Sequence, residues 1–214
     1  MYAIGGNALA PPGGVSGDEH AMILAQVMSD VVDLLEADWS VVLTHGNGPQ
    51  VGKLMSMDTD VIHTMDEWVA ATQGMIGHTL SLQLNSILSY RHRPERTAVV
   101  LTRVLVDAND EAFSFPTKPV GPVLSGEEVM ARDWDIATTI NGPRRVVASP
   151  MPMSVLDIDV IRTLVQQRAV VICGGGGGIP IITDEKQFKG IPSVIDKDRL
   201  SALLASELGL SLIH

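Results

Sequence analysis

Short apolar runs alternate with stretches of helical periodicity along this chain, and that alternation restricts its fold more than any other feature. Ala169–Cys173 is a continuous apolar run, whereas leucine or isoleucine recurs at every fourth position from Ile76 to Leu88. Such alternation is typical of an α/β fold, in which helices cover a sheet. We therefore predict a three-layer α/β sandwich with a mainly parallel central sheet.

The positions of these patterns predict the individual elements. Gly209 follows the last periodic residue and is expected to end the final helix. We predict helices that begin near Ser16 and at Pro49, and further helices over about Asp66–Ser89, Ser154–Gln167 and Asp198–Leu208. We predict strands over Met1–Ile4, Ser40–Thr44, Ala98–Val106 (as one central parallel strand), Ala169–Cys173 and Leu210–Ile213.

One segment fits neither pattern. Asp107–Asn141 is rich in proline, glycine and acidic residues, and it is too long for a simple connection between two elements. We expect this segment to form a small functional lobe, within about residues 107–142, on a single domain that spans residues 1–214.

The charge balance excludes one class of partner. The formal net charge is −10, and nucleic-acid binding proteins need a basic surface instead. The one basic cluster, Arg91–Arg96, is interpreted as a solvated loop after a helix. We expect no nucleic-acid partner.

The single cysteine and the absence of long apolar runs suggest a location. Cys173 directly follows an apolar run, so we interpret it as a buried structural thiol, with a reactive thiol as the alternative. No apolar run approaches the roughly 18 residues that span a membrane, and the start of the chain does not resemble a secretion signal. We expect no membrane partner and a cytoplasmic location.

Three glycine-rich loops follow predicted strands, and they are Gly5-Gly6-Asn7-Ala8, His45-Gly46-Asn47-Gly48-Pro49-Gln50 and Gly174–Gly178. Ligands of α/β proteins bind at the carboxyl ends of parallel strands, so these loops could converge on one site. Glycine lets a ligand approach the backbone closely, and the amides of a helix that begins at Pro49 would attract an anion. We therefore expect a site for a small anion.

Each loop also has a simpler explanation. The first could be a tight turn, and the third a flexible linker. His45 could act as a general base, but a histidine that is held by hydrogen bonds is the simpler interpretation. Neither a P-loop, which needs Gly-Lys-Ser/Thr, nor a GxGxxG motif that opens a helix is present.

Two lysines lie in unusual surroundings. Asp196-Lys197-Asp198 stands at a predicted helix start, where it could direct Lys197 toward a phosphoryl group or reach a magnesium ion. Asp198 as a helix N-cap is the alternative. Lys118 lies between two prolines in the expected lobe, where it could close over a phosphate or be an ordinary surface lysine.

Taken in order, eight segments that cover nearly the whole chain resemble the carbamate kinases of the amino-acid kinase group. HGNGPQ and TKPVGP favour this family over the acetylglutamate, aspartate and uridylate kinases. The segments are GGNAL (5–9), THGNGPQVG (44–52), TQGMIG (72–77), LTRVLVD (101–107), FPTKPVGP (115–122), RRVVASPMP (144–152), GGGGIPI (175–181) and VIDKD (194–198).

The resemblance implies reversible phosphoryl transfer between carbamoyl phosphate and ADP, which gives ATP and carbamate, with carbamate decaying to ammonia and carbon dioxide. It also implies a homodimer, a lid formed by the lobe, Mg²⁺ carried by ATP or ADP as substrate, and a place in arginine metabolism. No protein side chain is expected to bind a metal.

The resemblance assigns roles to individual residues. Lys118 is implied to be the lid lysine on the phosphate, Lys197 to stabilise the phosphoryl group in flight, and Asp198 to hold the lysines in place. Gly5, Gly6, Asn7, Gly46, Asn47 and Gly48 are implied to bind the carbamate or phosphoryl group, and Gly175, Gly176 and Gly177 to contact the phosphates through their backbone.

The chain departs from the family pattern in places. Thr72 stands where family members typically have serine, and Arg199-Leu200-Ser201 replaces an alanine-rich stretch. Family members continue beyond the position of His214 with a segment that contacts adenine and ribose, so we expect a C-terminally truncated chain. The alternative is a non-catalytic remnant that binds a small anion or a partner subunit.

Overall fold

The computed structural model describes residues 1–5, 9, 17–58, 62–185 and 187–211. The helices are α2 (Gly17–Glu36), α3 (Gly48–Met57), α4 (Met65–Tyr90), α5 (Gly126–Ala131), α6 (Ile158–Gln166) and α7 (Lys197–Leu208), with the 3-10 turns η1 (Glu111–Phe113) and η2 (Gly175–Gly177). The strands are β1 (Tyr2–Ile4), β2 (Val42–His45), β3 (Thr97–Val99), β4 (Arg103–Val106), β5 (Lys118–Val120), β6 (Ile136–Thr139), β7 (Gly142–Val147), β8 (Pro152–Val155), β9 (Val170–Ile172), β10 (Ile179–Asp184) and β11 (Gln187–Gly190).

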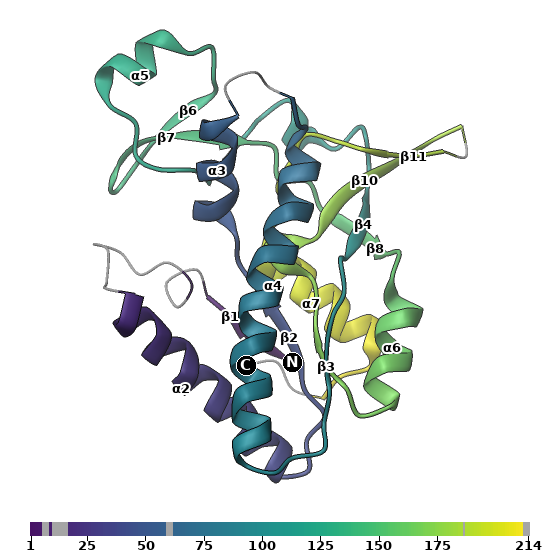
Figure 1. Ribbon diagram of the computed structural model, residues 1–214. Helices are drawn as coiled ribbons and strands as arrows, with labels where there is room; N and C mark the ends of the chain where they lie inside the picture. Colours follow the sequence, from purple (N-terminus) through teal and green to yellow (C-terminus); the bar gives the residue numbers. More distant parts are fainter. Residues whose placement is uncertain (6–8, 10–16, 59–61, 186, 212–214) are drawn as a thin grey trace.

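The centre of the molecule is a parallel sheet with the strand order β1-β2-β9-β3 (Figure 1). Residues of β2 and β9 alternate between its two faces. Leu43 and Ile172 pack among α2 and α4, whereas Val42 and Val171 pack among α6 and α7. These side chains are at most 1% exposed, and burying each contributes about 1.5–3 kcal/mol. The predicted three-layer α/β architecture is confirmed.

Most of the predicted helices are found. Pro49 lies in the first turn of α3, α4 is within one residue of its predicted bounds, and Gly209 ends α7 with the left-handed φ of 66°. The predicted start at Ser16 lies outside the described residues. The predicted strand over Leu210–Ile213 lies partly outside them, and its first two residues are not in a strand.

The prediction of one central strand over Ala98–Val106 is wrong. Thr97–Val99 is the edge strand β3 of the central sheet, and Arg103–Val106 is the strand β4 of a second sheet with the order β11-β10-β4-β8. Strand pairing is interrupted between β3 and β4. Thr102 lies in this interval, and its backbone N–H donates to the side-chain oxygen of Gln73 at 2.8 Å. An unbroken apolar run does not reveal this break, because the partner is 29 residues away on α4.

The helix predicted over Ser154–Gln167 begins later than expected. Pro152–Val155 is the strand β8, antiparallel to β4, and α6 starts at Ile158. The carboxylate of Asp157 fixes this corner, because it accepts hydrogen bonds from the backbone and the guanidinium of Arg103. The strands β10 and β11, which complete the second sheet, were not predicted.

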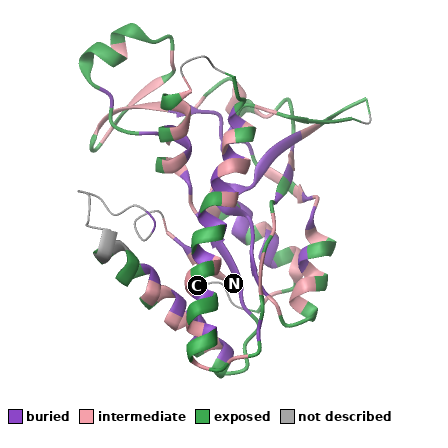
Figure 2. Ribbon diagram, viewed as in Figure 1, coloured by how far each residue is buried: buried purple, intermediate pink, exposed green. Residues whose placement is uncertain are grey.

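The segment expected to form a lobe builds a small antiparallel sheet with the order β5-β7-β6, together with the exposed helix α5 (Figures 1 and 2). This sheet reaches Val147, beyond the expected end near residue 142. The lobe rests on α3 where Gly52 meets Gly121, since a Cβ atom on Gly52 would lie 2.0 Å from the Cα atom of Gly121.

The five glycines after β9 are buried in the interior of the protein. A Cβ atom on Gly175 would lie 2.4 Å from the ring of His45, and one on Gly177 would lie 2.1 Å from the carbonyl oxygen of Ile195. Gly177 also has a φ of +88°, which L side chains rarely adopt. The alternative of a flexible linker is therefore wrong, since neighbouring protein atoms already require these positions to lack side chains.

No helix among the residues that the structure describes is long and apolar enough to cross a membrane.

Replacing Gly177 with alanine is expected to lower the free energy of unfolding by on the order of 3 kcal/mol, because the methyl group meets a backbone carbonyl and the left-handed φ is strained. The matched control is Gly74→Ala inside α4, where an added Cβ has no atom within 4 Å. That change should be neutral or stabilise by up to about 1 kcal/mol. Urea unfolding followed by circular dichroism measures both, and equal effects would contradict the packing argument.

Cys173 is expected to resist thiol reagents in the folded protein. Burial raises the pKa of its thiol to about 12, so almost no thiolate forms near pH 8, and the sulfur is inaccessible. Ellman's reagent should therefore modify it slowly in the native protein and rapidly in denaturing guanidinium chloride. Equal rates in the two states would show that the thiol is exposed by local opening.

Candidate active site

The glycine-rich loops after β1, β2 and β9 meet at the carboxyl edge of the central sheet. The backbone N–H of Gly46 donates to the carbonyl of Ile4 at 3.2 Å, which joins the first loop to the second. A Cβ atom on Gly176 would lie 2.1 Å from the carboxamide carbon of Asn47, which places the third loop against the second. No atom of the described residues lies within 4 Å of a Cβ atom built on Gly5, whereas Gly6 and Asn7 lie outside the described part of the chain.

His45 is a structural residue of this edge. Its ring is 1% exposed, and its Nδ1–H donates to the carbonyl of Gly46 at 2.9 Å. Burial lowers the pKa of the imidazole, so it stays neutral at physiological pH. This geometry agrees with a histidine held by hydrogen bonds, and it does not present the ring to solvent as a general base.

Asn47 precedes the first residue of α3, and its side chain is held by α4 instead of capping the helix. Its side-chain N–H donates to the hydroxyl of Thr72 at 2.8 Å, and that hydroxyl donates to the carbonyl of Val69 at 2.8 Å. Thr72 thus supplies a hydroxyl that a serine at this position could also supply. Asn47 is 2% exposed, so its position is fixed, and Gly48 begins the helix whose amides face the site.

Gln73 fixes the third loop and was missed by the sequence analysis. Its side-chain N–H donates to the carbonyl of Gly175 at 2.9 Å, while its oxygen accepts from Thr102. The hydroxyl of Thr102 in turn accepts from the N–H of Gly174 at 2.8 Å. A signal was present, because Gln73 lies between Val69 and Ile76 on the buried stripe of α4, which is apolar apart from Thr72 and Gln73.

The two predicted lysines both pair with aspartates at the start of α7. Lys118, at the beginning of β5, forms an ion pair with Asp196, and Lys197 pairs with Asp198 at 2.7 Å. The structure therefore brings Lys118 to the residue that precedes Lys197 in the chain. Asp196, and not Asp198, holds the lobe lysine.

Asp196 is also the N-cap of α7, the role that had been considered for Asp198. Its Oδ1 accepts the backbone N–H groups of Asp198 at 2.9 Å and of Arg199 at 3.3 Å. Partial burial raises the pKa of the Asp196 carboxyl, but the hydrogen bond and charge of Lys118, together with the hydrogen bonds from the backbone N–H groups of Asp198 and Arg199, lower it more, so the net shift is downward. The carboxylate is therefore ionised at neutral pH.

A cleft of about 560 Å³ opens beside this ion pair. Arg199 lines the cleft and donates to the carbonyl of Ser149 at 3.3 Å, and Asp110 lines it too and accepts the N–H of Met151 at 2.9 Å. The lining holds the cationic groups of Lys118 and Arg199 together with the carboxylates of Asp110, Glu111 and Asp196, and its cationic groups could bind an anion such as a phosphate. Among the residues that the structure describes, no group of three or more histidine, cysteine, aspartate or glutamate side chains could hold a metal ion.

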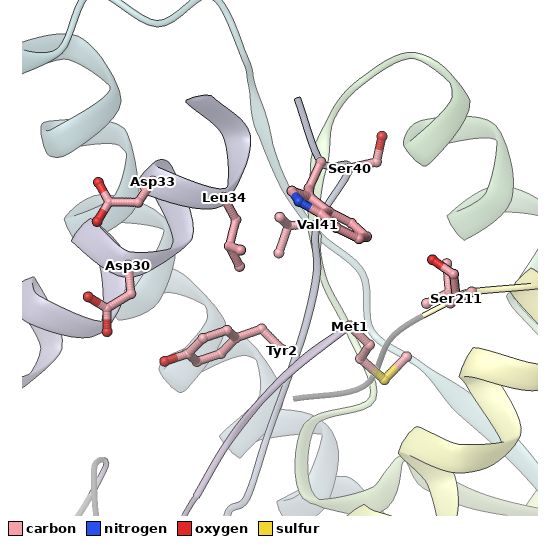
Figure 3. A pocket seen from close by; sticks show the side chains of 10 residues that line it. Met1, Tyr2, Asp30, Asp33, Leu34, Ser40, Val41 and Ser211 are labelled. Atoms are coloured by element: carbon pink, nitrogen blue, oxygen red, sulfur yellow. The ribbon is translucent and has the colours of Figure 1, made fainter. Parts of the chain in front are cut away.

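A second pocket, of about 410 Å³, lies at the opposite edge of the sheet (Figure 3). It is lined by Tyr2 and Val41 at the amino ends of β1 and β2, with Leu34 of α2 beside them. Ligand sites of parallel α/β sheets lie at the carboxyl ends of the strands. The glycine-lined edge, with its neighbouring cleft, is therefore the candidate site.

Comparisons with known proteins show the family to which this chain belongs. The model of the amino acid kinase family matches residues 2–213. Carbamate kinase 2 of Staphylococcus aureus (strain bovine RF122 / ET3-1) is 37% identical over 218 residues, which covers 96% of this chain and 69% of that protein.

Solved structures give the same result. The carbamate kinase of Giardia lamblia bound to citric acid superposes with a TM-score of 0.91 at 33% identity, covering 99% of this chain and 72% of that one. The same enzyme bound to AMP-PNP gives a TM-score of 0.86 at 32% identity, covering 99% and 71%. Because the family model matches residues 2–213 and a relative is 37% identical over 96% of the chain, this chain belongs to the amino acid kinase family.

Proposed function

We propose that this protein is a carbamate kinase, which transfers a phosphoryl group between carbamoyl phosphate and ADP to give ATP and carbamate. The observation that carries the proposal is the meeting of Lys118 and Asp196-Lys197-Asp198 beside the glycine-lined edge of the sheet. Relatives named as carbamate kinases, at 37% identity over 96% of the chain, support the same reaction. The alternative of a non-catalytic remnant has no comparable support.

Phosphoryl transfer depends on positioning and on positive charge, with little covalent chemistry for the protein to do. In our proposal Lys118 binds the phosphate from the lobe, Lys197 stabilises the group in transfer, and Asp198 orients Lys197 through their 2.7 Å contact. Gly5, Gly6, Asn7, Gly46, Asn47 and Gly48 bind the carbamate or phosphoryl group, and Gly175, Gly176 and Gly177 contact the phosphates through backbone amides.

The nucleotide is the second substrate. One structure of the Giardia lamblia enzyme was solved with AMP-PNP, which supports ATP and ADP as ligands of this family. We propose that Mg²⁺ enters with the nucleotide, since phosphate oxygens supply most of its ligands in such sites. In our proposal, residues 1–214 form the substrate-binding part with its lid lobe; they cover 69% of the length of Carbamate kinase 2.

The proposal includes a homodimer, a cytoplasmic location and a role in arginine metabolism. For the dimer, the supporting observation is apolar surface on α4 and on the chain after the edge strand β3. Leu82 is 54% exposed on α4, and Leu101 is 49% exposed beyond β3. Exposed apolar side chains on neighbouring elements are typical of a surface that a second subunit covers.

The full-length gene product is expected to make ATP from carbamoyl phosphate and ADP in the presence of Mg²⁺. A hexokinase-coupled assay measures the product. Folded protein that yields no ATP under these conditions would contradict the assignment, and calorimetry with Mg-ADP would then show whether nucleotide binding is absent.

Lys118→Ala and Lys197→Ala are each expected to lower kcat/KM by on the order of a hundredfold, because each removes a preorganised charge from the transferring group. The matched control is Lys189→Ala, which removes an exposed lysine paired with Asp184 on the β10–β11 ladder. That variant should keep the wild-type rate. Wild-type rates for both site variants would remove the proposed roles.

A further inference from the structure

We infer that Asp196 is a positioning residue, which holds Lys118 and the lobe against α7 until a phosphate group of the substrate replaces it. This inference rests on the proposed function, since it names what the site does before substrate arrives. It concerns a residue to which the family resemblance gave no role, and which the sequence analysis considered only as part of the Asp196-Lys197-Asp198 cluster.

The two carboxylate oxygens of Asp196 accept hydrogen bonds from different groups. Oδ1 accepts the backbone N–H groups of Asp198 and Arg199, and so caps α7. Oδ2 accepts the ammonium of Lys118. The two sets of contacts use different oxygens, so Oδ2 can lose Lys118 while Oδ1 keeps its hydrogen bonds to the start of α7.

The ion pair links two parts of the protein that are 78 residues apart in sequence. Lys118 begins β5, where it is paired across the ladder with Val147 of β7. Asp196 belongs to the body of the protein through α7, which packs on the central sheet. Fixing Lys118 therefore fixes the near edge of the three-stranded lobe sheet.

A ligand can reach this pair. The side chains of Lys118 and Asp196 are 30% and 29% exposed, and both line the 560 Å³ cleft. The other charges that line the cleft are Arg199, Asp110 and Glu111. A phosphate dianion attracts an ammonium more strongly than a carboxylate that already accepts two amides, so it can displace Asp196 from Lys118.

This exchange gives Lys118 a defined place in both states. Without substrate the ammonium of Lys118 stays paired with the carboxylate of Asp196, and the lysine side chain therefore remains at the cleft. With substrate the phosphate takes over Lys118, and the lobe follows the ligand instead of α7. Asp196 keeps its cap throughout, so the start of α7, which carries Lys197, does not move when Lys118 leaves.

Two substitutions separate the duties of Asp196. Asp196→Asn keeps a good N-cap but removes the charge that holds Lys118, whereas Asp196→Glu keeps the charge and replaces a good cap with a poor one. Hydrogen exchange of the β5 and β7 amides, measured without ligand, should accelerate at least severalfold in Asp196→Asn and much less in Asp196→Glu. The melting temperature should fall more in Asp196→Glu, which has the poorer N-cap, than in Asp196→Asn. Asp184→Asn, which breaks the exposed pair with Lys189, should leave lobe exchange unchanged.

Binding supplies the second readout. Calorimetric titration with inorganic phosphate should give roughly threefold tighter binding to Asp196→Asn than to the wild type, because the competing carboxylate is gone and partly exposed pairs contribute little. Phosphate should also slow lobe exchange in that variant toward the wild-type rate.

The inference is overturned if Asp196→Asn leaves the lobe as protected as in the wild type, or if it binds phosphate more weakly. Failure of the proposed function looks different, because folded wild-type protein would then bind phosphate yet produce no ATP from carbamoyl phosphate and ADP. The hydrogen-exchange and phosphate-binding measurements do not need turnover, so they test the proposed role of Asp196 whether or not the protein is a carbamate kinase.

Discussion

The architecture of this site depends on one steric constraint, which is that the chain after β9 must pass between two other loops without any side chain. The ring of His45 lies where a Cβ atom of Gly175 would project, and the carbonyl of Ile195 lies where one on Gly177 would project. Because glycine is costly to order, such a turn needs partners that hold it. Gln73 is one of these, since it reaches from α4 to the carbonyl of Gly175. The central sheet, the long helix and the loops of the site are thereby fixed as one unit.

The sequence predicted the elements whose signals are local, and it failed where the deciding partner is distant. The capping glycine Gly209 and the proline at the start of α3 act within one turn, so the helix ends were found. The break at Thr102 depends on Gln73, which no neighbouring residue reveals. In the same way, the motifs indicated Lys118 and Lys197 as site residues, but the pairing of Lys118 with Asp196 is made across 78 residues by the fold. The strand β8 was taken for helix because Val155 also fits a helical stripe.

Net charge says little about this site, although it argues against nucleic acid as a partner. The chain carries a formal charge of −10, yet its cleft presents cationic groups to a ligand. Each lysine of the site is paired with an aspartate, so the positive charge is locally balanced and remains available to a stronger anion. Bulk charge governs solubility and long-range steering, whereas binding depends on which charged atoms can exchange partners within a few ångströms.

The lobe is attached to the body at both ends of one short strand, and the two attachments differ in kind. At its far end, Gly121 packs against Gly52 of α3 with no room for a methyl group, and Val120 adds buried apolar contacts. At its near end, the ammonium of Lys118 meets a carboxylate in a cleft open to solvent. Close-packed contacts resist small displacements, whereas a partly exposed ion pair is worth little once another anion can replace it. In the proposed exchange, a ligand that arrives at the cleft therefore acts on the weaker attachment, whereas the close-packed glycine contact holds the far end of the strand in place.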